Sequence, residues 1–423
     1  MAKFNSFLYI LFFLFSFHLH ATEDKKNLLV LCSNGGFGHN AAAQTLKNLL
    51  GDEYNITIVY PIDEMRIWGV KSGEQIYNVM LRNDWIQSLN LITRYLAPKI
   101  FRTRKMQVEE IIKKHIDETK ADLLISLIPY VNYPASEAAR KSGTPFLLVT
   151  TDNDLRLWVH GLQGLKHPHF RVTVGSDLWC SRERLRKRNI PDSVIETTGL
   201  PIRTDFFVTK DKDSIRHEFG IPKTKPVVLI MIGGAGGDKA LDYAKRIGST
   251  QYGIHLVLCA GKNRQLVQDL QKIILHPTNT MTVVGFTTRI SDLMAISDLL
   301  VTKPGPGTIN EAMAMKLPIL VDATSTILSW EQTNIDMIMQ YGIGDYVEDF
   351  DELEPLLRQF LFDTELQKEV KDSYSKIPAN RFKESIGPIV SSMCKLKKHR
   401  KFQKQPTYET NSSLRPMDLP SYS

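Results

Sequence analysis

The stretch DLLVTKPGPGTINEAMAMKLPILVDA, residues 298–323, contains an apolar run, a turn rich in Gly and Pro, a helix-like segment and a second apolar run. Both apolar runs are short, continuous and rich in Val, Ile and Leu, which is typical of strands buried on both faces of a parallel sheet. The helix is predicted to begin at Thr308. This order of elements predicts a parallel α/β domain.

The same alternation of strand-like and helix-like segments extends in both directions along the 423-residue chain. Strands are predicted at 27–33, 54–60, 121–128, 144–152 and 170–176, and then at 225–234, 253–261, 280–286, 298–305 and 317–323. Such alternation predicts two Rossmann-like, doubly wound α/β domains. We place the first at residues 27–205 and the second at 206–390, joined at GLPIRTDFF, residues 199–207.

The two ends of the chain differ from this pattern. Residues 4–19 are an apolar run that spans about 24 Å as a helix, shorter than the roughly 30 Å of a bilayer core. Residues 1–26 are therefore interpreted as a signal peptide or a signal anchor, and both alternatives stay open. The tail from 391 to 423 is basic and then polar, and it is predicted to be disordered.

The net charge of +7 is compatible with anionic partners, but it does not indicate which kind of anion binds. No recognised RNA- or DNA-binding module accompanies it, so nucleic acid is not expected as a partner. Residues 95–105 combine aromatic and apolar residues with basic ones, and Arg94 precedes them. This segment is a candidate contact with an anionic membrane surface, or else a solvated basic helix face.

In doubly wound sheets, ligands bind beyond the carboxyl ends of the strands. The loop SNGGFGHN, residues 33–40, follows the first predicted strand. Its Gly36 and Gly38 allow close approach of the backbone to a ligand at a helix N-terminus. His39 could take a proton from an acceptor hydroxyl, or it could merely pack. The spacing is not that of a dinucleotide fingerprint.

A second glycine loop follows the predicted strand that begins the second domain. Its Gly234 and Gly236 either approach a phosphate or sugar closely or form a flexible turn.

The third loop lies in the stretch quoted first. Gly305, Gly307 and Thr308 could cradle a diphosphate at the start of a helix, and Glu311 could accept hydrogen bonds from a ribose. The pair Thr308 and Glu311 also has the spacing of a capping box, which requires no ligand.

These segments together resemble the monogalactosyldiacylglycerol synthase and processive diacylglycerol glucosyltransferase family, which is related to the peptidoglycan N-acetylglucosaminyltransferase. The resemblance covers roughly residues 27–385. It rests on GGFGHNAAAQTL, LLVTTD, TGLPIRTDFF, IGGAGG and WEQTN, and above all on the order and spacing of motifs from Gly285 to Pro318.

The resemblance implies a GT-B fold whose C-terminal domain holds a UDP-sugar as donor substrate, with no permanently bound cofactor and no metal site. It implies that Phe286 lies against the uracil, that residues 305–308 bind the diphosphate and that Glu311 binds the ribose. Contacts near the sugar would come from Glu331, Gln332 and Asn334.

The resemblance also makes His39 a candidate base or a neighbour of the oxyanion, and it aligns Asp152 as a second candidate base. After Asp152 the family pattern of His and Trp is reversed here, as Trp158 and His160, so neither is carried over. A strand-end Asp that caps a turn is the alternative for Asp152. The acidic residues of 152–154 could also bind a divalent ion.

The expected function is transfer of a hexose from a UDP-sugar to a membrane lipid, with diacylglycerol as the expected acceptor. The alternatives are a UDP-N-acetylglucosamine-using transferase or epimerase of the same fold, and a non-catalytic nucleotide-binding protein. The expected location is the cytoplasmic face of a membrane, supported by Lys25 and Lys26 after the apolar run, whereas the signal-like segment leaves export open.

Overall fold

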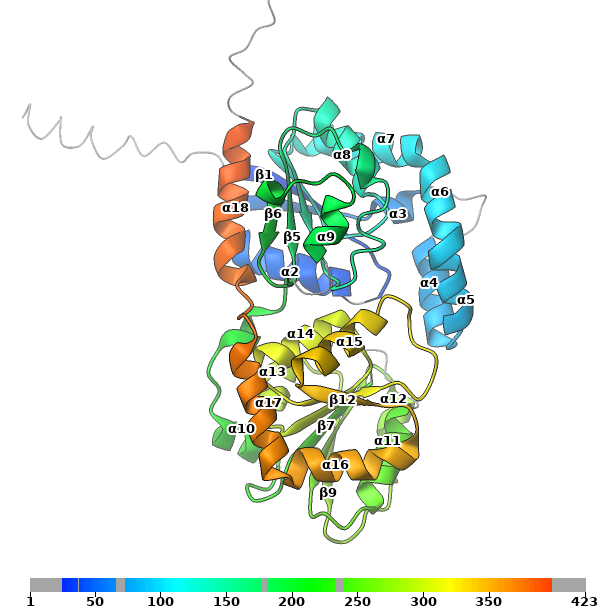
Figure 1. Ribbon diagram of the computed structural model, residues 1–423, viewed down its shortest axis with the longest axis vertical. Coiled ribbons are helices and arrows are strands. Elements are labelled where there is room, and N and C mark those ends of the chain that lie inside the picture. The colour runs from blue at the N-terminus through cyan, green and yellow to red at the C-terminus, as the bar shows by residue number, and fades with distance from the viewer. Residues whose placement is uncertain (1–24, 37, 66–72, 177–180, 233–238, 398–423) are drawn as a thin grey trace, which may run out of the picture.

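The computed structural model describes residues 25–36, 38–65, 73–176, 181–232 and 239–397. The apolar N-terminal segment, most of the basic tail and the loop with Gly234 and Gly236 lie outside these ranges. The described residues form two α/β domains, one above the other in Figure 1, each built on a six-stranded parallel sheet.

The sheet of the first domain has the strand order β2-β1-β3-β4-β5-β6. Its strands are Lys26–Leu31 (β1), Tyr54–Val59 (β2), Leu123–Ser126 (β3), Phe146–Val149 (β4), Phe170–Val174 (β5) and Ile195–Thr197 (β6). The chain reverses its direction of winding between β1 and β3, where Leu29 pairs with Leu124. A ligand is expected beside this switch point, and the first glycine loop leaves β1 there.

The sheet of the second domain has the strand order β12-β11-β10-β7-β8-β9. Its strands are Val227–Met231 (β7), His255–Gly261 (β8), Thr280–Gly285 (β9), Leu299–Thr302 (β10), Ile319–Asp322 (β11) and Gly344–Val347 (β12). The switch point lies between β7 and β10, where Leu229 pairs with Leu300. The loop that follows β10 is the third loop of the sequence analysis, so this loop stands at the expected ligand position.

All ten predicted strands are present, and the doubly wound α/β class is confirmed. The edge strands β6 and β12 were not predicted. The helices of the first domain are Gly38–Leu50 (α2), Pro61–Glu64 (α3), Gly73–Arg82 (α4), Ile86–Leu91 (α5), Ala97–Thr103 (α6), Lys105–Thr119 (α7), Asn132–Lys141 (α8) and Ser181–Arg186 (α9), with a π-helical turn Ile92–Leu96 (η1) and 3₁₀ turns Leu162–Gly164 (η2) and Asp192–Val194 (η4). Those that follow are Lys212–Glu218 (α10), Lys239–Ser249 (α11), Arg264–Gln271 (α12), Ile290–Ala295 (α13), Pro306–Ala314 (α14), Gln332–Tyr341 (α15), Leu353–Phe362 (α16), Thr364–Lys376 (α17) and Phe382–Leu396 (α18), with 3₁₀ turns Thr204–Phe207 (η5) and Phe350–Glu352 (η6).

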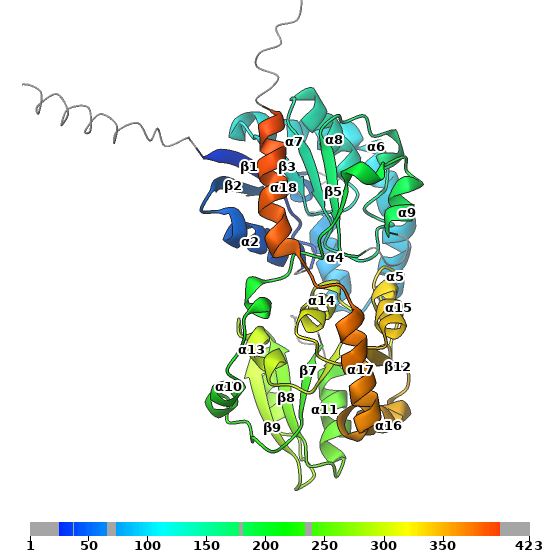
Figure 2. The same ribbon diagram turned by 60° about the vertical axis from the view of Figure 1, so that its left-hand side comes forward.

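The last helix crosses back to the first domain, as Figure 2 shows beside β1 and β3. Its side chains Phe382, Ile386 and Val390 are buried in one cluster with residues of β1 and α2. The sequence placed the end of the second domain at residue 390 and the start of the tail at 391. The structure differs, because the apolar face of α18 extends to Cys394 and packs on the first sheet.

Helices α4, α5 and α6 form a column along one side of the molecule that reaches from the first domain towards the second (Figure 1). Side chains of α4 and α5, including Met80 and Leu89, pack with Leu328 and Trp330 of the second domain. Among the residues that the structure describes, no helix has the length and apolar character needed to cross a bilayer.

Candidate active site

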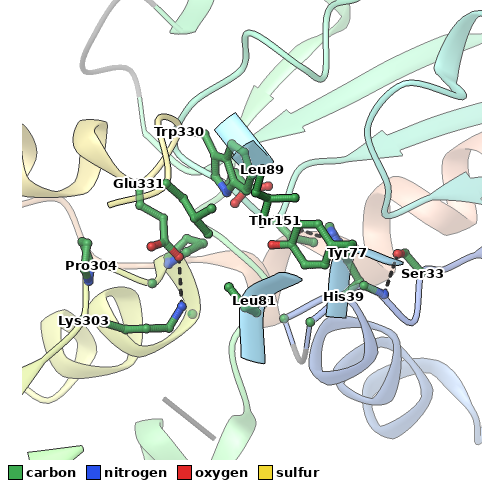
Figure 3. Close-up of a pocket in the computed structure, with 18 of the residues that line it drawn as sticks. Ser33, His39, Tyr77, Leu81, Leu89, Thr151, Lys303, Pro304, Trp330 and Glu331 are labelled. Atoms are coloured by element: carbon green, nitrogen blue, oxygen red, sulfur yellow. Dashed lines mark hydrogen bonds and ion pairs between the residues drawn. The ribbon is translucent and has the colours of Figure 1, made fainter. Parts of the chain in front are cut away.

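A cavity of about 1570 Å³ lies between the two domains. The first glycine loop, the loop after β10 and the inner faces of α4 to α6 all contribute to its walls. Small-molecule sites usually measure roughly 300–1,000 Å³, so this cavity has room for two substrates. Figure 3 shows Lys303 and Glu331 on one side of the cavity and His39 and Thr151 on the other.

The third loop starts its helix two residues earlier than the sequence predicted. Helix α14 begins at Pro306 with Gly305 as its N-cap, and no side chain caps it. Proline at the first helical position is favourable because its missing N–H would be unpaired there anyway. The capping box expected between Thr308 and Glu311 is therefore absent. A Cβ atom added at Gly307 would meet nothing within 4 Å, so the backbone there faces open space.

Glu311 is nearly buried and points to the segment that joins the domains. Its Oε1 accepts a hydrogen bond from Arg203 Nε at 2.9 Å, and both residues line the cavity. Burial raises the pKa of Glu311, whereas the Arg203 guanidinium lowers it. Arg203 is itself held over the ring of Phe206, 4.7 Å from its centroid. This arrangement fixes the position of the Glu311 carboxylate at the cavity wall.

Lys303 and Glu331 form a second ion pair at this end of the cavity, with Nζ and Oε1 3.1 Å apart. Lys239 also lines the cavity, where its Nζ donates to Thr324 Oγ1 at 2.7 Å. Phe286 is 64% exposed at the cavity wall. The open start of α14 makes this end of the cavity suitable for an anion, and Lys303 and Lys239 stand beside it.

Two predicted sugar contacts do not reach the cavity. Gln332 is exposed and donates to Asp336 Oδ1, because one helical step beyond Glu331 turns the side chain away. Asn334 is 1% exposed and lies behind the wall. It accepts a hydrogen bond from Asn153 Nδ2 at 2.8 Å and donates to the carbonyl of Pro304 at 2.7 Å. Asn334 therefore connects the two domains.

The two candidate bases lie on the opposite wall, beside one indole ring. Trp158 Nε1 donates to Asp152 Oδ2 at 3.0 Å, and the indole ring lies 6.2 Å from the His39 ring. Thr151 Oγ1 lies 3.1 Å from His39 Nδ1. Tyr77 of α4 lines the cavity between the two walls and stacks with Trp330, with ring centroids 6.5 Å apart.

The protonation of the two candidate bases differs. Burial lowers the pKa of His39 to about 4, so its imidazole is neutral at pH 7. Burial raises the pKa of Asp152 to about 7, with smaller contributions from Glu331 and Asp154. An efficient general base has a pKa near the working pH, which favours Asp152.

The acidic residues after β4 have separate partners. Asp154 pairs with Arg156, whereas Asp152 accepts from Trp158. Within the described ranges, no three His, Cys, Asp or Glu side chains are grouped as metal ligands.

In the first glycine loop, Gly36 has φ +76°, a conformation that glycine adopts without strain, and Gly38 is the first residue of α2. Both line the cavity. The predicted contacts Gly234 and Gly236 lie outside the described residues.

The cavity continues into an apolar arm along α4, η1 and α6. Its walls there are almost wholly aliphatic or aromatic: Met80, Leu81, Ile86, Leu89, Ile92, Leu96, Ile100, Phe101, Tyr130 and Leu157. Leu96 is also 49% exposed, so the arm extends to a residue on the outer surface.

Two doubly wound domains that face each other across a cavity define the fold class of the protein, which is the GT-B fold of glycosyltransferases. MurG of Acinetobacter baumannii shares the fold with a TM-score of 0.57 at 16% identity, over 87% of this chain and 99% of MurG. Residues 228–323 match the family model of the glycosyltransferase family 28 C-terminal domain.

Two relatives that are similar in sequence to most of this chain have names that refer to diacylglycerol. The chloroplastic monogalactosyldiacylglycerol synthase of Spinacia oleracea is 26% identical over 360 residues, which cover 80% of this chain and 66% of that enzyme. The processive diacylglycerol beta-glucosyltransferase of Bacillus licheniformis is 25% identical over 379 residues, or 86% and 94% of the two chains. The chain thus spans slightly less than two thirds of the plant relative. The resemblance drawn from the motifs is confirmed.

Sequence reasoning missed several residues that line the cavity. Arg203 is 108 positions from Glu311, and only the folded chain brings the two together. Tyr77 and Glu74 lie on α4, which no motif marks. Two signals were available, because Arg203 lies in TGLPIRTDFF and Lys239 follows IGGAGG after one residue, and both motifs contributed to the family resemblance.

Proposed function

We propose that the protein transfers a hexose from a UDP-sugar to a membrane lipid, with diacylglycerol as the acceptor, at the cytoplasmic face of a membrane. The observation that carries the proposal is the continuity of one cavity from a polar end, at the start of α14, to an apolar arm. An anionic donor and a lipid acceptor require these two environments within reach of each other.

The donor end is supported by its charge and by its backbone. The diphosphate would lie at the start of α14, where Gly307 leaves room and Lys303 supplies positive charge. Glu311 would accept hydrogen bonds from the ribose, and Phe286 would cover the uracil. The ion pair with Glu331 keeps Lys303 at the cavity wall.

In the proposed reaction, the acceptor hydroxyl oxygen forms a bond to the anomeric carbon while the bond from that carbon to the β-phosphate oxygen breaks. Asp152 takes the hydroxyl proton, since its pKa of about 7 is matched to this role. The neutral imidazole of His39 lies beside the same indole and orients the acceptor hydroxyl. UDP leaves with its charge stabilised by Lys303 and the amides of α14.

The outer surface around the apolar arm supports membrane contact. Seven of the twelve exposed large apolar side chains in the described part of the chain lie between residues 76 and 106: Ile76, Val79, Trp85, Leu91, Tyr95, Leu96 and Met106. The same segment carries exposed Arg94, Lys99, Arg102 and Lys105. Apolar side chains interleaved with cations suit an anionic bilayer surface.

The test is transfer of radiolabel from UDP-glucose, UDP-galactose and UDP-N-acetylglucosamine to diacylglycerol in lipid vesicles. Wild type should label the lipid with at least one donor. Glu311→Ala should lose transfer mainly through weaker donor binding, and His39→Ala through a lower turnover rate. Glu365→Ala, an exposed site on α17, is the matched control and should behave as wild type.

The alternatives predict different results in the same experiment. An epimerase would convert the UDP-sugar without vesicles, and a non-catalytic protein would bind UDP without turnover. Undiminished transfer in both Glu311→Ala and His39→Ala would remove the site assignment.

A further inference from the structure

The second domain contributes a short loop to the apolar arm of the cavity. Residues 327–330, which we call the bridging loop, lie between β11 and α15 and reach the first domain. Leu328 is 3% exposed and packs with side chains of α4 and α5 that line the arm, among them Met80 and Leu89. Leu328 lines the cavity as well. One wall of the arm therefore belongs to the other domain.

Side chains of the first domain hydrogen-bond to the backbone of the bridging loop. Asn90 of α5 donates from Nδ2 to the carbonyl of Ile327 at 2.9 Å and accepts at Oδ1 from the amide of Ser329 at 2.8 Å. One amide side chain thus holds the backbone on both sides of Leu328. Arg156 Nη2 donates to the carbonyl of Ser329 at 2.6 Å. The position of the loop is therefore set by the first domain.

The contacts at the end of the bridging loop are fixed in the same way. Asp154 is 3% exposed and accepts a hydrogen bond from Arg156 Nε at 2.6 Å, which orients the guanidinium towards the loop. Trp330 stacks with Tyr77 of α4, with ring centroids 6.5 Å apart, and Figure 3 shows it beside Leu89. Hydrogen bonds, an ion pair and stacking together hold the loop against the first domain.

The two substrates thus differ in what they require of the domains. The proposed UDP contacts Lys303, Gly307 and Phe286 all belong to the second domain, whereas the lipid arm is built by both. We propose that Asn90 is a positioning residue that holds the bridging loop in place as a wall of the acceptor arm. A lipid in contact with Leu328 and α5 together binds only when the domains are so arranged, and it therefore stabilises that arrangement. This inference rests on the proposed function, because it concerns the acceptor of the same transfer.

The test measures transfer to diacylglycerol at increasing mole fraction in phosphatidylcholine vesicles, with the UDP-sugar that wild type uses, and UDP binding by calorimetry. Asn90→Ala removes two hydrogen bonds between the domains, so the KM for diacylglycerol should rise about tenfold. The kcat should stay within about threefold of wild type and the Kd for UDP within about twofold. A merely structural role would reduce the amount of active protein, which lowers kcat and leaves KM unchanged.

Asn83→Ala is the matched control for Asn90→Ala. Asn83 is exposed just after α4, and its Nδ2 donates to the carbonyl of Val79 at 2.7 Å, within the first domain. This variant should behave as wild type.

Leu328→Ala perturbs the same wall from the second domain. It leaves the hydrogen bonds of Asn90 in place, because these involve only backbone atoms of the loop. It should raise the KM for diacylglycerol about tenfold through lost apolar contact. The double variant should be less impaired than the product of the two single effects, because both substitutions act through the same loop.

An unchanged KM for diacylglycerol in folded Asn90→Ala protein overturns the inference, and so does a Kd for UDP that rises as much as this KM. If Asn90→Ala does not fold, Leu328→Ala decides the point by the same two measurements. Wild type that binds UDP but labels no diacylglycerol would remove the proposed function itself. Normal transfer by wild type and by both variants would remove this inference alone.

Discussion

Removal of the Asn334 side chain should weaken the connection between the two domains rather than a sugar contact. Its amide makes two buried hydrogen bonds, to Asn153 at 2.8 Å and to the Pro304 carbonyl at 2.7 Å. Asn334→Ala would leave one buried donor and one buried acceptor unpaired, at about 1–3 kcal/mol each. Water that enters the cavity left by the Asn334 side chain can hydrogen-bond to one of these two groups in part. We therefore expect a loss of about 2–4 kcal/mol in the free energy of unfolding.

Urea unfolding followed by tryptophan fluorescence measures this loss. Gln332→Ala is the matched control, since Gln332 is exposed on the same helix and should change the free energy by less than about 0.5 kcal/mol. The reasoning would be refuted by Asn334→Ala protein of native stability with a raised KM for the UDP-sugar alone. That result would restore the sugar contact expected from the sequence.

Three further outcomes are expected. Protonation of Asp152 as the pH falls through about 7 should lower kcat/KM, and Asp152→Asn should reduce the rate by about 10²–10⁴-fold and remove this pH dependence, as measured by a pH–rate profile. Glu311→Ala should weaken UDP binding by about 10–100-fold in calorimetry, and an unchanged Kd would exclude Glu311 from the donor pocket. Arg102→Ala should weaken binding to anionic vesicles about fivefold in co-sedimentation, whereas Lys113→Ala on α7 should not. Equal effects of the two substitutions would reject membrane contact by the segment between residues 76 and 106.

The strands were predictable where their burial leaves a continuous apolar run. The segments of β1 and β10 are buried on both faces and read as strands from composition alone. The edge strands β6, Ile195–Thr197, and β12, Gly344–Val347, have only three and four residues and are partly polar, so they contain no apolar run. No local pattern distinguishes such strands from loops. The other two edge strands, β2 and β9, have six residues each and were predicted.

The candidate site divides in the same way. Gly305, Gly307 and Glu311 could be identified because a strand, a turn and a helix follow one another within a few residues. The side chains that surround these residues could not be predicted, since Arg203 contacts Glu311 from a position 108 residues away in the chain. Gln332 and Asn334 belong to WEQTN, one of the motifs on which the resemblance rests, but one helical step turns the Gln332 side chain to solvent and Asn334 is buried behind the cavity wall.

The sequence by itself determined the fold class, the switch-point loops and the resemblance to lipid glycosyltransferases, because each depends on residues adjacent in the chain. Only the tertiary structure decided that the amides of Asn34 and Gly36 in the first glycine loop are occupied, since Glu74 and Asn78 accept their hydrogen bonds from a helix about 40 residues away. It also joined α18 to the first domain and placed the apolar arm beside the candidate bases. Burial and long-range pairing set these features, and neither is encoded in local spacing.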